Sequence, residues 1–226
     1  MAYGGARTDY HPSTGSGVWG FGWQIEEYLT NAGAVNPDTL FTIWIGGNDL
    51  LNFTGDPSIA ITKAVTNIYL GINGLVNAGA KNILLMNMPN LGATPLLNGQ
   101  NLAYGLYDNP LGGATLSAGF NQALDIAVDP FRSAINLYEV DVFAMMGQFM
   151  ADDLFDNDTN MLQANLGTSD SYMFWDPIHP TTYTHSLIAE VAYNKVDPVP
   201  EPTTLLLLGF GLVGLAGAGR KKFFKK

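Results

Sequence analysis

Apolar residues recur along the chain with two spacings, one typical of helices and one typical of buried strands. Helical spacing, with apolar residues three or four positions apart, occurs in four segments: residues 18–31, 58–78, 116–135 and 179–194. Mainly apolar stretches with the length of a buried strand occur in three segments: residues 39–45, 81–88 and 136–142. Because helices and strands alternate without an internal repeat, the pattern predicts an α/β fold with a largely parallel sheet.

The predicted sheet has few strands for a sheet that helices cover on both faces. We therefore expect that an edge or central strand is missing from the chain. Residues 89–113, which are rich in Gly, Pro and Asn, and the acidic residues 151–175 are predicted to be long loops. Pro130 predicts a kink in the third helix.

The composition is that of a folded protein with an acidic body. The 226 residues are 47% hydrophobic and 13% charged, which excludes a mostly disordered chain and suffices for one sizeable domain. A net charge of −10 would repel phosphate backbones, so we expect no nucleic-acid partner. The absence of Cys excludes disulfides, thiolate chemistry and Cys-ligated zinc, but it leaves the compartment open.

Residues 199–226 differ from this body in charge and hydropathy. Residues 203–219 carry no charge, and their length is at the short limit for crossing a bilayer as a transmembrane helix. Five of the ten Lys and Arg residues lie in the last seven positions, so residues 1–200 carry a net charge of −14. This basic flank predicts a cytoplasmic tail, with residues 1–198 across the membrane. A buried core helix or a plain tail anchor is the alternative, although five glycines disfavour a soluble helix.

The order of Pro200-Glu201-Pro202, apolar stretch and basic cluster resembles a PEP-CTERM sorting signal. The resemblance implies an exported protein of a Gram-negative bacterium, with an inner-membrane precursor delivered to the cell envelope, cell surface or extracellular matrix. It also implies an exosortase-type processing enzyme as a partner. Export needs a leader, yet Met1 is followed by Ala-Tyr-Gly-Gly without a basic or apolar segment. We therefore expect Met1 to be an internal position, or the chain to be a fragment.

The first candidate for chemistry is the loop Gly46-Gly47-Asn48-Asp49, which follows the first predicted strand. Open α/β sheets bind ligands at the carboxyl ends of their strands. Glycines let the backbone approach a substrate, and the Asn48 amide is a neutral donor able to hold a developing oxyanion. The alternative is a glycine turn in which Asn48 or Asp49 caps the next helix.

The second candidate is Asp176-Pro177-Ile178-His179-Pro180. An Asp three residues before a His, held by two prolines, can place its carboxylate on one imidazole nitrogen and leave the other to accept a proton from a nucleophile. The alternative is a helix N-terminus capped by Asp176, with a surface His.

Together these elements resemble the SGNH (GDSL) hydrolase family over residues 2–192. The resemblance implies a three-layer α/β/α fold and lipase- or esterase-like activity on a small-molecule, lipid or acylated-sugar ester. It implies His179 as the base, Asp176 as its orienting group and Asn48 as an oxyanion donor. Residues 2–8 look like the family's Gly block, whose backbone N–H also binds the oxyanion; Gly5 is preferred, and Gly4 stays open.

The chain departs from the family pattern in one respect, because the motif that carries the nucleophilic serine is missing from it. No Gly-Asp-Ser motif occurs, and Gly55-Asp56-Pro57-Ser58 follows the Asn block with a Pro between. We expect the Ser block and the first strand to lie upstream of Met1. Residues 1–198 are then an SGNH hydrolase domain without its nucleophile and inactive as given. The alternative is a non-catalytic cell-surface or matrix binding protein that retains the hydrolase fold.

Other polar residues fit simpler roles. The acidic segment 152–160 lacks the spacing and Gly of an EF-hand loop, so a solvated loop is favoured over a calcium site. His11 is expected to be a solvated loop residue, and His185 lies too far round a helix from His179 to share its site. No thiol, metal cluster or phosphate-binding Gly loop is found in the sequence, and we expect no metal or cofactor.

Overall fold

The computed structural model describes residues 3–10, 19–32, 34–51, 53, 55–97, 112–151, 155 and 171–197. Within these residues three parallel strands form one sheet in the order β1 (Leu40–Ile43), β2 (Asn82–Met86), β3 (Asn136–Val140). Leu40 pairs with Asn82, which pairs with Asn136. The predicted parallel sheet is confirmed, and the carboxyl ends of its strands lie together at one edge.

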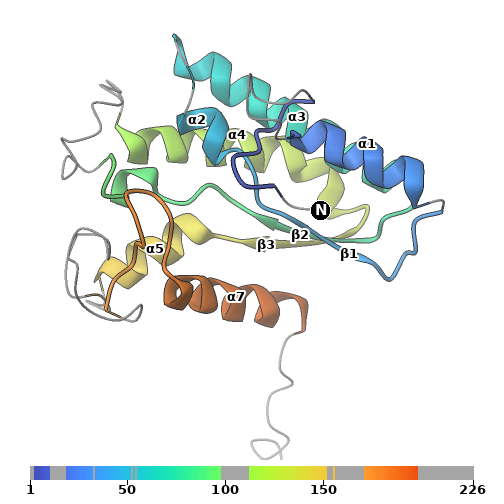
Figure 1. Cartoon of the computed structure of the whole chain (residues 1–226). Coiled ribbons are helices and arrows are strands. Elements are labelled where there is room, and N and C mark those ends of the chain that lie inside the picture. Colours follow the sequence, from blue (N-terminus) through green and yellow to red (C-terminus); the bar gives the residue numbers. More distant parts are fainter. Residues whose placement is uncertain are drawn as a thin grey trace, which may run out of the picture.

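Helices cover both faces of this sheet (Figure 1). On one face lie α1 (Phe21–Asn31), α3 (Pro57–Asn77) and α4 (Gly113–Arg132), and on the other lie α5 (Val142–Ala151) and α7 (Thr182–Val196). Side chains of β2 alternate between the two resulting cores, because successive residues of a strand point to opposite faces. Ile83 and Leu85 join the first core, and Leu84 joins the second. The described residues therefore form three layers, α/β/α.

The long elements expected from apolar spacing are present, with bounds that differ by a few residues. The last helix begins at Thr182 and not at His179, because Thr181 caps it by accepting the N–H of Thr184 at 3.2 Å. Three elements were missed: α2 (Gly47–Leu51), the 3-10 helix η1 (Leu91–Ala93) and α5. The first two are too short to show a period, and α5 is apolar around most of its circumference, which hides a stripe.

Helix α3 begins where the sequence offers a strong cap. The Asp56 carboxylate accepts the N–H of Ser58 at 2.8 Å, and Pro57 occupies the first turn. Within the described residues, α3 is the one helix long and apolar enough to cross a membrane by length and composition. Its buried side chains, among them Ile68 and Ile72, pack into the core with α1 and α4.

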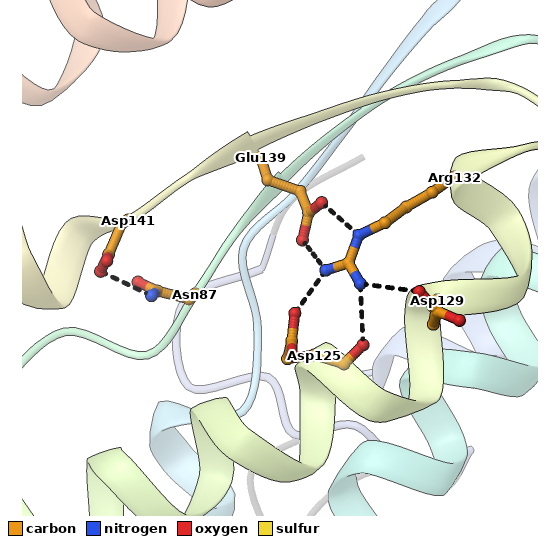
Figure 2. A network of polar contacts seen from close by, with 6 residues as sticks. All are labelled: Asn87, Asp125, Asp129, Arg132, Glu139 and Asp141. Carbon is orange, nitrogen blue, oxygen red and sulfur yellow. Dashed lines mark hydrogen bonds and ion pairs between the residues drawn. The ribbon is translucent and has the colours of Figure 1, made fainter.

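A charged network fastens the end of α4 to β3 (Figure 2). Arg132 donates two hydrogen bonds of 2.8 Å to the Glu139 carboxylate in β3. It also contacts Asp125 and Asp129 on the preceding turns of α4. These contacts hold the edge strand β3 against the helix that precedes it in the chain.

Several predicted features lie outside the described residues. They are the apolar stretch 203–219 with its basic tail, His11 and nearly all of the acidic segment 152–160.

Candidate active site

The loop after β1 is shaped by Gly46. Gly46 has a φ of 113°, a conformation that strains any residue with a side chain. A Cβ at this position would lie 2.7 Å from Cζ of the buried Phe120. The chain then turns at once into α2, which carries Asn48 and Asp49. Both side chains therefore lie at the carboxyl edge of the sheet, where ligands bind in open α/β folds.

Hydrogen bonds join this loop to the predicted Gly block. The Asn48 amide Nδ2 donates to the carbonyl oxygen of Ala6 at 3.0 Å. Gly5 is exposed and has a φ of 78°, and a tight turn precedes Ala6, whose N–H donates to the Tyr3 carbonyl at 3.2 Å. The structure thus brings the Gly5 and Asn48 segments together from positions more than forty residues apart.

Asp49 makes a second link between the same two segments. Asp49 is 5% exposed, and its carboxylate accepts the N–H of Thr8 at 2.9 Å and the Thr8 hydroxyl at 2.7 Å. Asn67 of α3 donates to the same hydroxyl at 3.2 Å. Burial raises the pKa of Asp49, and the two bonds from Thr8 oppose that rise. Asp49 thus binds the Gly block in place of the helix-capping role that the sequence left open.

The second predicted pair is also in contact. Oδ2 of Asp176 lies 2.6 Å from Nδ1 of His179, and Oδ1 accepts the backbone N–H groups of Ile178 and His179 at 2.8 and 2.7 Å. Burial alone would raise the pKa of Asp176, but the two backbone N–H groups and the imidazole outweigh it and hold this pKa below its ordinary value. The alternative role of Asp176 as the cap of the last helix is wrong, because Thr181 is that cap.

The loop that carries this pair is held in place by backbone hydrogen bonds on several sides. Phe174 and Pro180 form an antiparallel bridge, and the N–H of Trp175 donates to the His179 carbonyl at 2.7 Å. The N–H of Leu96, in the segment after β2, donates to the Pro177 carbonyl at 2.9 Å. The loop is therefore attached to the connection that leaves the middle strand at its carboxyl end.

Two further polar side chains fix the neighbouring strand ends. Asn87, just after β2, donates to Asp141, just after β3, at 2.8 Å (Figure 2). Its side-chain oxygen accepts the N–H of Phe143 at 3.1 Å. This bridge places the start of α5 relative to the sheet.

The helical-spacing argument that separated His185 from His179 rests on a helix that includes both residues, and this premise is wrong. His179 precedes α7, whereas His185 lies in its first turn. The His185 ring packs edge-on against Trp44, with 6.2 Å between ring centroids. Burial lowers the pKa of His185, and the positive charge that His179 can carry lowers it further. His185 thereby packs the first turn of α7 against the end of β1.

No group of three or more metal-ligating side chains occurs in the part of the chain that the structure describes. Thr8 belongs to the predicted Gly block but was given no role of its own, and Asn67 and Trp44 were not singled out from the sequence. No local signal marks them, because each acts through a partner far away in the chain.

Comparison with known proteins adds to this geometry. The chain matches the model of the family described as GDSL-like lipase/acylhydrolase over residues 1–192. Residues 198–221 match the PEP-CTERM protein-sorting motif, which indicates an exported protein of Gram-negative bacteria.

Similar curated proteins include a phosphatidylcholine-sterol acyltransferase of Aeromonas hydrophila, 23% identical over 77% of this chain and 65% of the relative. A thermolabile hemolysin of Vibrio parahaemolyticus is 27% identical over 80% of this chain and 48% of the relative. An acetylesterase of Thermothelomyces thermophilus is 33% identical over 43% of this chain and 37% of the relative. The chain thus spans between about half and two thirds of the length of the first two relatives. With a family match that covers residues 1–192, the chain belongs to the GDSL-like lipase/acylhydrolase family.

Proposed function

We propose that this chain is part of an exported ester hydrolase that works by acyl transfer through a serine. The observation that carries the proposal is the pair of Asp176 and His179. The carboxylate lies 2.6 Å from Nδ1, while the imidazole side chain is 68% exposed. A carboxylate that fixes one ring nitrogen leaves the other, Nε2, to act as a general base.

In the proposed reaction, a serine hydroxyl attacks the carbonyl carbon of an ester while its proton passes to Nε2 of His179. The oxyanion of the tetrahedral intermediate accepts hydrogen bonds from the Gly5 N–H and the Asn48 amide. The intermediate then collapses, the bond to the alcohol oxygen breaks, and the alcohol takes the proton from His179. Water repeats both steps on the acyl-serine and releases the carboxylic acid.

The nucleophilic serine and a further strand are proposed to lie upstream of Met1 in the complete protein. Among the described strands, β1 pairs with β2 alone. A groove of about 620 Å³ runs along its other side, lined by Phe21 of α1 and by Leu40, which is 39% exposed. Tyr3 and Ala6 of the Gly block also line this groove. An unpaired strand edge in an apolar groove suits a parallel strand whose carboxyl end would lie beside the Gly block.

The test is to read the coding sequence upstream of Met1 and express the longer protein beside residues 1–226. The longer protein should hydrolyse p-nitrophenyl butyrate and be labelled covalently by a fluorophosphonate, whereas residues 1–226 should do neither. In the longer protein, His179→Gln should lower kcat by about a thousandfold or more, given the usual contribution of a general base. His185→Gln is the matched control and should lower kcat less than tenfold.

Three results would overturn the proposal. The first is serine-dependent hydrolysis by residues 1–226 alone. The others are an upstream stop codon and a folded longer protein without hydrolysis, and either of these would favour a non-catalytic surface protein that keeps the fold.

For the C-terminal region, we propose that residues 203–219 span the inner membrane in the precursor and that an exosortase-type enzyme cleaves near Pro200-Glu201-Pro202. The sorting motif and the basic tail support this proposal. Mass spectrometry of the protein from an exosortase-bearing host should show loss of the basic tail, and an intact C-terminus at the cell surface would contradict it.

A further inference from the structure

Asp49 is a buried carboxylate whose partner lies far away in the sequence. A carboxylate is costly to bury unless hydrogen bonds or an opposite charge compensate it. Here both oxygens are used on one residue, Thr8, through its N–H at 2.9 Å and its hydroxyl at 2.7 Å. The contact spans 41 residues and lies within the proposed site, so it fixes one site segment relative to another.

Thr8 is held from more than one side. Its side chain is completely buried, and its hydroxyl accepts a hydrogen bond from Asn67 of α3 at 3.2 Å. The neighbouring Arg7 carbonyl accepts the N–H of Phe21, the first residue of α1, at 2.8 Å. The segment is thus attached to α1, α2 and α3 within two consecutive residues.

The chain between Thr8 and Gly5 is short, and a further hydrogen bond holds it at Ala6. The Ala6 carbonyl accepts the Asn48 amide at 3.0 Å. Gly5 itself is exposed, and a Cβ built on it meets no atom within 4 Å. Because Gly5 has a φ of 78° and no packed side chain, its orientation depends on the residues that follow it.

We infer that Asp49 is a positioning residue, which orients the Gly5 N–H by holding Thr8 in place. The two hydrogen bonds from Thr8 to the Asp49 carboxylate are called the clamp below. Adjacent residues of α2 then build both parts of the oxyanion site: Asn48 supplies an amide, and Asp49 aligns the backbone that supplies the second donor. An oxyanion donor is effective only when it is held in place before the reaction. The consequence for catalysis rests on the proposed function, but the clamp itself does not.

The first experiment uses ¹⁵N-labelled residues 1–226 and measures amide hydrogen exchange and ¹⁵N relaxation. In Asp49→Ala, the Thr8 amide should exchange about tenfold to a hundredfold faster, as expected for loss of a hydrogen bond to a charged group. The Gly5 order parameter should fall below about 0.6, the range of flexible backbone. Amides of β2 should keep their protection from hydrogen exchange, compared with the wild-type chain. Asp56→Asn, which changes an exposed capping carboxylate, should alter neither Thr8 nor Gly5.

Thr8 variants test the same clamp if Asp49→Ala fails to fold. Thr8→Ser retains both donors and should keep the wild-type Gly5 signal, whereas Thr8→Val loses the hydroxyl and should shift it toward the Asp49 variant. An unchanged Gly5 order parameter in Asp49→Ala or Asp49→Asn overturns the inference. Equal loss of protection at Thr8 and in β2 also overturns it, since Asp49 would then act on global stability.

The second experiment uses the longer protein of the proposed function. Asp49→Asn should lower kcat about tenfold or more with KM within about twofold, because a misaligned donor weakens transition-state binding. A KM increase with unchanged kcat would overturn the positioning role. If the longer protein hydrolyses no ester at all, the proposed function fails while the relaxation result on residues 1–226 still decides the clamp.

Discussion

Replacing Gly46 by alanine should destabilise the fold more than any neighbouring glycine change in this loop. A Cβ at Gly46 would lie 2.7 and 3.0 Å from two carbons of the Phe120 ring and 3.1 Å from the Met88 methyl. The thioether chain of Met88 can move aside. The Phe120 ring cannot, because it is completely buried in the core between the sheet and α4.

The magnitude follows from two independent costs. The backbone φ of 113° is strained for alanine by about 1–3 kcal/mol. Overpacking against an immobile core ring adds about 1–3 kcal/mol. Gly46→Ala should therefore lower the free energy of unfolding by about 2–6 kcal/mol, a large part of the 5–15 kcal/mol that is typical of a domain.

Urea unfolding followed by tryptophan fluorescence measures this loss. The matched control is Gly47→Ala, one residue further on, where a Cβ meets nothing within 4 Å and the residue begins α2. It should leave the unfolding free energy unchanged or raise it by up to about 1 kcal/mol. A value for Gly46→Ala within about 0.5 kcal/mol of wild type would refute the reasoning. Phe120→Leu in the Gly46→Ala background should recover part of the loss, with a coupling energy above about 0.5 kcal/mol.

Two other substitutions test contacts elsewhere in the fold. Asp176 has a folded pKa below its ordinary value of 3.8, so its stabilising contribution is present above that value and is lost as the pH falls through the folded pKa. The difference in unfolding free energy between wild type and Asp176→Asn should therefore shrink between about pH 5 and pH 2, and a difference that grows on acidification would contradict this. Gly71→Ala would overlap the Phe21 ring and should cost about 1–3 kcal/mol, whereas Gly74→Ala has no atom nearer than 3.8 Å and should be neutral or slightly stabilising in thermal unfolding.

The architecture could be predicted from the sequence because burial leaves a periodic trace. The stripe in α3, which includes Ile61, Val65, Ile68 and Ile72, faces the core as its spacing requires. The apolar run of β2 likewise divides between the two cores with a period of two. Short elements such as α2 leave no such trace, since five residues do not complete two helical turns.

Local patterns predicted the site only where its contacts are local, and the family resemblance supplied the more distant pairing of Gly5 with Asn48. Asp176 and His179 are three residues apart, and the sequence alone indicates that they can meet. The contacts of Asp49 with Thr8, and of Thr8 with Asn67, span 41 and 59 residues. Such pairs depend on how α2, α3 and the N-terminal segment pack, and a single polar residue in each carries no pattern that predicts its partner.

The two halves of the proposed site are therefore held by different kinds of contact, and they should fail differently. Asp176 makes three hydrogen bonds within four residues, two to His179 and one to the Ile178 N–H, in a loop closed by the Phe174–Pro180 bridge. Among the described residues, the Gly5 segment is closed locally by one turn, and its position depends on side chains from α2 and α3. Partial loss of tertiary packing would release Gly5 while the Asp176–His179 contact persists. A preserved Asp176–His179 contact in a damaged variant is thus no proof of an intact site, and the order of the Gly5 backbone is the more sensitive measure.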